Sequence, residues 1–533
     1  MRRLLSAIVV SFVFLTTTIY SLQYRPTNTQ LDRDLTEVSI PQLQTLYASG
    51  KYTATQVTQW YLDRIARYDG VYKALLHVDS SGALATAAAQ DATKKKAGSV
   101  FKPGVLWGVP IVVKANTSIQ GLVTSNGWAG YLVKGHELLA PKDATIVAKL
   151  KAAGAVILGH SNMPDFAASD TTSSTAGGRT GNAYNWRFSP GGSSGGTATS
   201  VAANFALFGT GTDTSNSIRL PSGASGLVGV LPTRGLVSIY GIHPLDWLLD
   251  DAGPIARSVT DAAIALSVMA GEDPGDFRTI GSSAKAQPGP YTRYLKRDAL
   301  KGKRFGVPAF IVSDAQRSIP DGNTLRPETL TAFMTAIQGL RSAGATVVFD
   351  DAILPNGFSA LTEDIETRPY MREGVENFLQ DFGPDEYHST AEFARALGAP
   401  LPGLFTSFGF QILKADPGAE SSFWAPQRRA LAVYEEALNR FRLDGFVYPA
   451  LQMPPNDETT GRPSEGPHTR TGWANTIGVP AVAVPAGFYS NGLPFGLEFS
   501  ARQWKDGDLL GWAFAYEQAT RHRKPPVLVN RAP

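Results

Sequence analysis

The chain has 533 residues, of which 43% are hydrophobic and 18% are charged, and its formal net charge at pH 7 is +3. This composition excludes a disordered chain, and the near balance of acidic and basic side chains excludes the basic surface of a nucleic-acid-binding protein. The sequence contains no cysteine, so disulfides, thiolate metal ligands and cysteine nucleophiles are excluded as well.

The chain begins with two arginines and an apolar run, residues 4–15, after which polarity rises at Gln23. A short basic start before an apolar run is typical of a signal peptide, so we expect residues 1–23 to direct the protein to secretion. The alternative is an N-terminal membrane anchor, because the apolar segment is just long enough to span a bilayer. Both interpretations bring residues 24–533 into the secretory pathway.

After this leader, apolar residues recur at helical spacing, and Thr53 and Thr55 are candidate N-caps of a helix. Further along, short β-like runs alternate with helical segments and glycine-rich loops, which predicts a large α/β domain. The predicted helices are two within 39–68, then 144–153, 197–207, 326–343 and 508–520, and the predicted strands are 109–113, 155–158, 346–349, 446–448 and 481–484.

We expect residues 24–533 to form one domain with a core at about 100–310, a variable elaboration at about 310–440 and a C-terminal core part at about 440–525. The elaboration is predicted to be more helical and more charged than the core. Its aromatic residues either line an acyl pocket or pack in the interior, which is the commoner use of such side chains. These residues are Phe378, Phe405, Phe408, Phe410, Phe423 and Trp424.

The segment 190–196, PGGSSGG, places two serines among four glycines, whose backbone adopts conformations closed to other residues. A linker is one interpretation, but the Ala-rich segment 197–207 that follows predicts a buried helix instead. A second interpretation is the nucleophile elbow Gly-x-Ser-x-Gly, with Ser194 as the nucleophile. The residues before the motif are polar and turn-prone, so the strand that an elbow requires is missing.

Two more segments hold candidate polar residues. The segment 209–219, GTGTDTSNSIR, is reminiscent of a phosphate loop but lacks a third glycine and a Gly-Lys-Ser/Thr sequence. Lys114 ends an apolar run, where a lysine either reaches water from the end of a strand or is held neutral by burial. Asn116 begins a glycosylation sequon, which we expect to be unused because it lies so close to Lys114.

Together these three segments resemble the amidase signature family, whose hydrolases use a Ser-cisSer-Lys triad. The resemblance assigns Lys114 as the catalytic lysine, Ser193 as the cis-serine and Ser217 as the acylated nucleophile. Further matching segments are AGAVILGHSNMPDF at 153–166 and NTIGVPA at 475–481, and the resemblance extends over about residues 35–525. It implies a single large α/β domain with a mixed central sheet surrounded by helices.

The triad has a physical rationale. A serine hydroxyl becomes an effective nucleophile when a base takes its proton, and a lysine serves as that base only if burial leaves it neutral. Ser193 would pass the proton from Ser217 to Lys114, and we expect a cis peptide bond between Gly192 and Ser193 to direct its hydroxyl for this. The backbone N–H groups expected to form the oxyanion hole are those of Thr214, Ser215, Asn216 and Ser217.

The loop before the nucleophile departs from the family pattern. Where many members carry Gly-Gly, this chain has Ser215 and Asn216. Asparagine tolerates left-handed backbone conformations better than serine, so we expect a reshaped oxyanion loop. Asp213 and Arg219 stand at the family's flanking positions, where they either pair to fix the loop or form a solvent-exposed ion pair.

The resemblance implies a hydrolase that cleaves the C–N bonds of linear carboxylic amides through an ester on Ser217. It implies a small-molecule amide substrate, no nucleic-acid partner, no metal and no organic cofactor. The seven histidines show no zinc-site spacing, although a distant histidine in a Ser-His-Asp triad remains a formal alternative. Three competing functions also stay open: an esterase, an amidotransferase subunit on the same fold, and a non-catalytic binding protein with this fold.

Overall fold

The computed structural model describes residues 29–312, 325–460 and 468–530. The predicted leader, residues 1–23, lies outside the described residues. The chain divides into two compact units, Met1–Thr36 and Glu37–Pro533. In the first unit the structure describes helix α1, Gln30–Leu35, which Thr29 caps through a hydrogen bond with Asp32. Among the described helices, none combines the length and the apolar character needed to cross a membrane.

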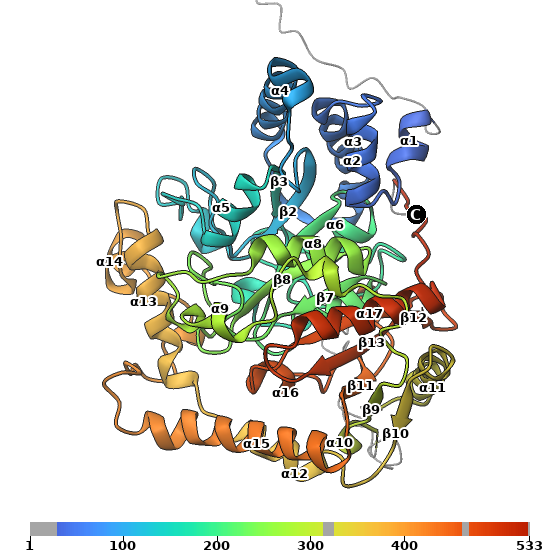
Figure 1. Ribbon diagram of the computed structural model, residues 1–533. Coiled ribbons are helices and arrows are strands. Elements are labelled where there is room, and N and C mark those ends of the chain that lie inside the picture. The colour runs from blue at the N-terminus through green and yellow to red at the C-terminus, as the bar shows by residue number, and fades with distance from the viewer. Residues whose placement is uncertain (1–28, 313–324, 461–467, 531–533) are drawn as a thin grey trace, which may run out of the picture. The chain divides into compact units, whose positions relative to one another are not determined.

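An eleven-stranded mixed sheet organises the second unit (Figure 1), with the strand order β1-β3-β2-β6-β8-β7-β12-β13-β11-β9-β10. Strands β2, β3 and β6 run parallel to one another, and β6, β8, β7, β12 and β13 follow as antiparallel neighbours. The expected α/β fold with a mixed central sheet is confirmed. The strands are β1 Leu75–Val78, β2 Val109–Lys114, β3 Ala155–Ser161, β6 Phe208–Asp213, β7 Val228–Leu231, β8 Asp251–Ala256, β9 Arg304–Gly306, β10 Thr346–Val348, β11 Gly445–Pro449, β12 Ala481–Phe488 and β13 Pro494–Ala501, with β4 Ser173–Ser174 and β5 Gly178–Arg179 in a separate pair.

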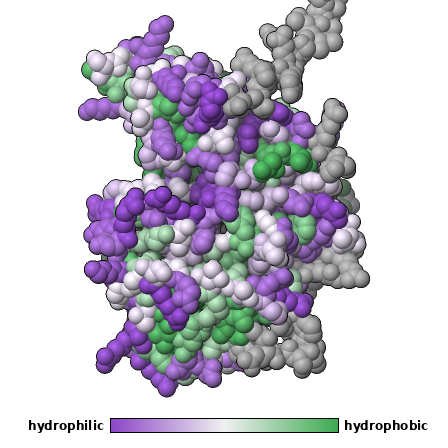
Figure 2. Space-filling view, turned by 90° about the vertical axis from the view of Figure 1, so that its right-hand side faces the viewer, coloured by the Kyte–Doolittle hydropathy of each residue, from purple (hydrophilic) through white to green (hydrophobic). Residues whose placement is uncertain are grey.

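Helices surround this sheet, and α8 and α17 lie in front of its strands in Figure 1. On the face drawn in Figure 2 hydrophilic residues are widespread, and apolar residues gather in its lower part. The helices of this unit are α2 Ile40–Ala48, α3 Ala54–Tyr72, α4 Ser80–Ala97, α5 Thr145–Ala152, α6 Gly195–Ala202, α7 Arg219–Ala224, α8 Val259–Met269, α9 Ser282–Lys285, α10 Ala309–Val312, α11 Pro327–Ser342, α12 Asn356–Glu363, α13 Met371–Phe382, α14 Thr390–Leu397, α15 Ala425–Arg440, α16 Trp473–Thr476 and α17 Asp506–Thr520.

The predicted helices and strands are found, with shifted ends. Thr53 caps α3 by accepting a hydrogen bond from the N–H of Gln56, whereas the hydroxyl of Thr55 donates to Asp91. The predicted helix 197–207 is too long, because α6 ends at Ala202 and Asn204 adopts a left-handed conformation with φ 58°.

Strand β6 is one of the strands that the sequence pattern did not predict, because glycine-rich segments such as 209–219 are typical of loops. It lies between β2 and β8 and is buried throughout. Its glycines allow close packing: a Cβ on Gly209 would lie 2.6 Å from Cγ2 of Thr197, and a Cβ on Gly211 would lie 3.0 Å from Oγ of Ser194. The close approach brings α6 and the serines before it onto the end of β6.

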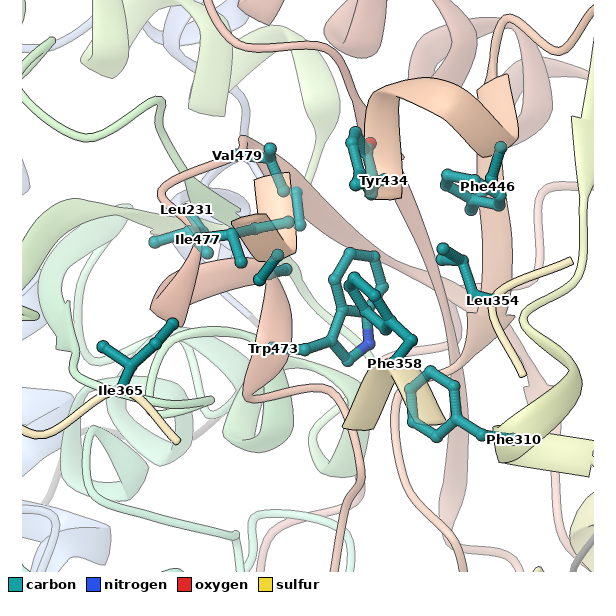
Figure 3. Close-up of a cluster of buried hydrophobic side chains, with 14 of the residues drawn as sticks. Leu231, Phe310, Leu354, Phe358, Ile365, Tyr434, Phe446, Trp473, Ile477 and Val479 are labelled. Atoms are coloured by element: carbon teal, nitrogen blue, oxygen red, sulfur yellow. The ribbon is translucent and has the colours of Figure 1, made fainter. Parts of the chain in front are cut away.

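A buried apolar cluster joins the segment 310–440 to the last part of the sheet, with Trp473 among its members (Figure 3). The Trp473 ring lies 5.7 Å from that of Phe358 in α12 and 5.3 Å from that of Tyr448 in β11. Aromatic pairs at these separations add to the free energy gained from burying their surface. Trp473 directly follows Gly472, which packs against the side chain of Ser215. The cluster therefore holds Gly472 in position beside the loop that contains Ser215.

We expect Phe358→Ala to lower the free energy of unfolding by about 3–5 kcal/mol, because the side chain is only 1% exposed and its removal leaves a cavity beside Trp473. Urea denaturation followed by tryptophan fluorescence measures the loss. Phe349→Ala is the matched control, since Phe349 is 42% exposed and the same truncation there should cost less than about 0.5 kcal/mol. Equal losses in the two variants would contradict this account of the cluster.

Candidate active site

Lys114 ends β2 with its side chain completely buried. Its Nζ donates to Oγ of Ser193 over 2.7 Å, to Oγ1 of Thr212 over 2.8 Å and to the carbonyl oxygen of Thr212 over 3.3 Å. Asn116 Nδ2 donates to the same Thr212 hydroxyl over 3.1 Å. The alternative in which the lysine reaches water from the end of the strand is therefore wrong.

Burial lowers the pKa of Lys114 to about 7, because the protein interior solvates an ammonium ion poorly. The carboxylates of Asp250 and Asp213 act in the opposite direction, since negative charges favour the protonated amine. The amino group is thus divided between its charged and neutral forms near neutral pH. A neutral lysine amine can accept a proton, as a general base must.

The expected cis peptide bond between Gly192 and Ser193 is present. Ser193 is buried, and its hydroxyl lies against Lys114. A glycine is needed at position 192, because a Cβ there would lie 2.5 Å from the carbonyl oxygen of Thr171.

Ser194 does not occupy a nucleophile elbow. It stands at the N-cap of α6 with a fully buried side chain, and its Oγ donates to the carbonyl oxygen of Thr212 over 3.2 Å. The residues before it, 190–193, form a loop and not the strand that the elbow requires.

Ser217 lies in the loop between β6 and α7 and is largely buried, with 7% of the residue exposed. The N–H of Ser194 donates to the carbonyl oxygen of Ser217 over 3.2 Å, which brings this loop beside the loop of Ser193. Within the described part of the chain, the Ser217 hydroxyl makes no hydrogen bond, either to Ser193 or to a histidine. The structure therefore brings Lys114 to Ser193 directly and places Ser217 next to Ser194.

The loop before Ser217 presents several backbone donors. The N–H groups of Thr214, Ser215, Asn216 and Ser217 find no acceptor among the residues that the structure describes. Ser215 and Asn216 both have negative φ, so neither residue adopts a left-handed conformation in this loop. Ser215 fits because residue 472 is glycine: a Cβ on Gly472 would lie 2.4 Å from Oγ of Ser215.

Asp213 and Arg219 form a completely buried ion pair, so the solvent-exposed alternative is wrong. Oδ2 of Asp213 accepts from the N–H of Ile218 over 3.0 Å and from Nε of Arg219 over 3.2 Å. Arg219 Nη2 also donates to the carbonyl oxygen of Ser215. The pair therefore holds the loop of Ser217 from both ends.

A second buried carboxylate, which the sequence pattern did not indicate, also binds Arg219. Arg219 Nη1 donates to Oε2 of Glu498 in β13 over 2.7 Å and to the carbonyl oxygen of Thr471 over 3.0 Å. Glu498 is completely buried, and this burial raises its pKa to about 7. No local pattern identifies Glu498, because it lies 279 residues from Arg219 in the chain.

Further polar side chains, which the sequence did not predict as site residues, form hydrogen bonds around the loop of Ser217. Thr214 Oγ1 donates to Oδ1 of Asp250, whose pKa burial raises to about 7. Asn475 Nδ2 donates to the carbonyl oxygen of Asp213 over 2.9 Å. Asn475 belongs to the NTIGVPA segment noted above, which was the available signal for it. Asn116 of the sequon is itself buried.

The aromatic residues of the elaboration serve mainly in packing. Phe378, Phe405 and Phe423 are buried in apolar clusters, whereas Phe408 and Phe410 are exposed. Trp424 packs partly buried against one of those clusters. The described residues contain no group of three or more histidine, aspartate or glutamate side chains arranged to hold a metal ion.

The sequence and the fold of the chain are both similar to those of known proteins. A family model described as Amidase matches residues 56–510. A glutamyl-tRNA(Gln) amidotransferase subunit from Thermosynechococcus vestitus is 32% identical over 494 residues, which cover 89% of this chain and 97% of that protein. The corresponding protein from Gloeobacter violaceus is 31% identical over 518 residues, covering 93% and 99%.

Solved structures agree with the sequence relatives. The native peptide amidase from Stenotrophomonas maltophilia matches with a TM-score of 0.77 and 31% identity, covering 92% of this chain and 99% of that one. An amidase family protein from Bacillus anthracis matches with a TM-score of 0.74 and 27% identity, covering 93% of each chain. The chain belongs to the amidase signature family.

Proposed function

We propose that the protein hydrolyses carboxylic amides through an ester on Ser217, with Lys114 and Ser193 as a proton relay. The observation that carries the proposal is the buried amine of Lys114, which lies 2.7 Å from Oγ of Ser193 and has a pKa near neutrality. A structural lysine would gain nothing from this placement, because burial penalises its charged form.

In the first half of the reaction, Ser217 Oγ attacks the carbonyl carbon of the amide. Its proton passes to Ser193 Oγ, and the proton of Ser193 passes to Nζ of Lys114, so that the lysine becomes charged. The unpaired N–H groups of the loop 214–217 then stabilise the developing oxyanion. When the C–N bond breaks, Lys114 returns the proton through Ser193 to the leaving nitrogen.

In the second half, water attacks the ester carbonyl and the same relay takes the proton of that water. The C–O bond to Ser217 breaks, the acid leaves, and Ser217 regains its proton from Ser193. Neither half needs a metal ion or an organic cofactor, because the lysine supplies the base and the backbone N–H groups supply the hydrogen bonds that stabilise the oxyanion.

We propose linear amides as the substrates, and two relatives give this proposal its context. The peptide amidase is named for action on peptides, and the bacterial relatives are named as subunits of an amidotransferase. The predicted leader favours an independent hydrolase over one component of an amidotransferase that acts on tRNA. An esterase and a non-catalytic binding protein are the competing functions.

We also propose that residues 1–23 direct the protein into the secretory pathway. Expression in the native host followed by intact-mass measurement tests this, and we expect a mature chain that begins near residue 24 outside the cytoplasm. A retained leader in a membrane fraction would indicate an anchor. A full-length chain in the cytoplasm would contradict both interpretations.

Reaction with a fluorophosphonate probe tests the proposed nucleophile. We expect the adduct on Ser217, loss of labelling in Ser217→Ala, and at least about a hundredfold slower labelling in Lys114→Met, because general-base assistance is worth about 10²–10⁴-fold. Mass mapping of the adduct identifies the serine.

Ser225→Ala is the matched control, since Ser225 is another buried serine whose Oγ has no hydrogen-bond partner in the described chain. It should leave labelling within about twofold. An adduct on another serine would contradict the assignment of Ser217. A folded protein that the probe does not label would favour the binding protein.

The rate of labelling should rise with pH, because only the neutral form of Lys114 accepts a proton. With a pKa of about 7, the rate should increase about tenfold between pH 6 and pH 8 and then level off.

Asp250 titrates in the same range, so Asp250→Asn separates the two groups. Removing that negative charge should move the midpoint to lower pH if Lys114 titrates. Disappearance of the rise in this variant would assign the titration to Asp250 and contradict the proposal.

A further inference from the structure

Thr212, in β6, contacts the buried amine of Lys114 with both its side chain and its backbone. The threonine is 2% exposed, and Nζ of Lys114 donates to its hydroxyl oxygen over 2.8 Å and to its carbonyl oxygen over 3.3 Å. The same amine donates to Oγ of Ser193 over 2.7 Å. Among the described residues, Thr212 therefore supplies two of the three acceptors around this amine.

Three acceptors match the three N–H donors of a lysine ammonium ion. When Lys114 takes up the proton that leaves Ser217, its new charge is completely buried, and a buried charge is costly unless its donors are hydrogen-bonded. The carboxylates of Asp250 and Asp213 also favour the charged amine, but their own hydrogen bonds go to other residues, with Arg219 on Asp213. Direct solvation of the ammonium therefore falls to Thr212 and Ser193.

The neutral amine has two N–H donors and one lone pair, so its orientation decides whether it can act as a base. The carbonyl oxygen of Thr212 can only accept, and its hydroxyl oxygen can accept the second N–H. With both N–H groups directed at Thr212, the lone pair faces Oγ of Ser193. This is the direction from which the proposed relay delivers the proton.

Several contacts fix the Thr212 hydroxyl in place. Nδ2 of Asn116 donates to the same oxygen over 3.1 Å. The backbone of Thr212 pairs with Ala252 in β8, and Oγ of Ser194 donates to its carbonyl oxygen over 3.2 Å. In addition, a β-branched side chain has few rotamers. The hydroxyl thus holds its position before any proton moves.

We infer that Thr212 is a positioning residue, which turns the lone pair of Lys114 toward Ser193 and completes the set of acceptors for the protonated amine. The inference rests on the proposed function, in which Lys114 is the base. It gives a task to a hydroxyl that takes no part in the proton transfer itself. Asn116, which the sequence marked only as part of a sequon, supports that hydroxyl.

Fluorophosphonate labelling of Thr212→Val over a range of pH tests the inference. Valine is close to threonine in shape but lacks the hydroxyl, so the charged amine loses one acceptor and the neutral amine is less well oriented. Because the charged form suffers most, the pKa of Lys114 should fall. We expect the midpoint of the pH profile to move down by about one pH unit and the maximal rate to fall about tenfold.

Two further variants separate the hydroxyl from packing. Thr212→Ser keeps the hydroxyl, so it should keep the parent midpoint and a maximal rate within about threefold of the parent. Thr199→Val is the matched control, because Thr199 in α6 is also completely buried and its hydroxyl donates to the carbonyl oxygen of Gly181 over 3.0 Å. This control should keep the parent midpoint and a rate within about twofold.

A lower rate in Thr212→Val at the parent midpoint would indicate a merely structural effect and would overturn the inference. An unchanged profile, or a loss of about tenfold in Thr212→Ser, would overturn it as well. If the valine variant does not fold, Thr212→Ala takes its place with the same expected profile. Absence of labelling in a folded parent protein would contradict the proposed function, whereas a labelled parent with an unchanged variant contradicts the role of Thr212 alone.

Discussion

The amino group of Lys114 lies in the interior, between the hydroxyls of Ser193 and Thr212, and the proposed chemistry depends on its burial. An ammonium ion in that position loses most of the solvation that water would provide. The nearby carboxylates of Asp213 and Asp250 recover part of this loss, and the balance holds the pKa of Lys114 at about 7. A weaker desolvation or a stronger negative field would keep the lysine charged and unable to accept a proton.

Arg219 links this balance to the loop of the nucleophile. It binds Asp213, Glu498 and the carbonyl oxygen of Ser215 from a completely buried position. By pairing with Asp213 it reduces the field that would otherwise favour the charged form of Lys114. The same contacts hold the N–H groups of the loop in place before a substrate arrives, which is the condition for electrostatic stabilisation without reorganisation.

Local patterns predicted the elements whose periodicity is strong. The run that became β2 and the cap at Thr53 follow from residues that are neighbours in the chain. Strand β6 escaped prediction because its glycines, needed for close packing against α6, also typify loops. The family resemblance identified Lys114, Ser193 and Ser217 as candidate site residues. Their spacing in the sequence did not indicate that the lysine is buried.

The residues that complete the site were beyond sequence reasoning. Glu498 and Thr471 reach Arg219 from the far end of the chain, and Asn475 reaches the carbonyl oxygen of Asp213 from the same region. The conformation of Ser215 also depends on a residue that is distant in the chain. In the fold Ser215 keeps a negative φ, and its side chain occupies space that Gly472 leaves open.

Direct titration of Lys114 would test the central claim. NMR of protein labelled at the lysine Cε carbons follows each amine through pH, and comparison with Lys114→Met identifies the signal of Lys114. The account predicts a midpoint at about pH 7. A midpoint near the ordinary lysine value of 10.5 would show that the amine stays charged, and would contradict its role as a base.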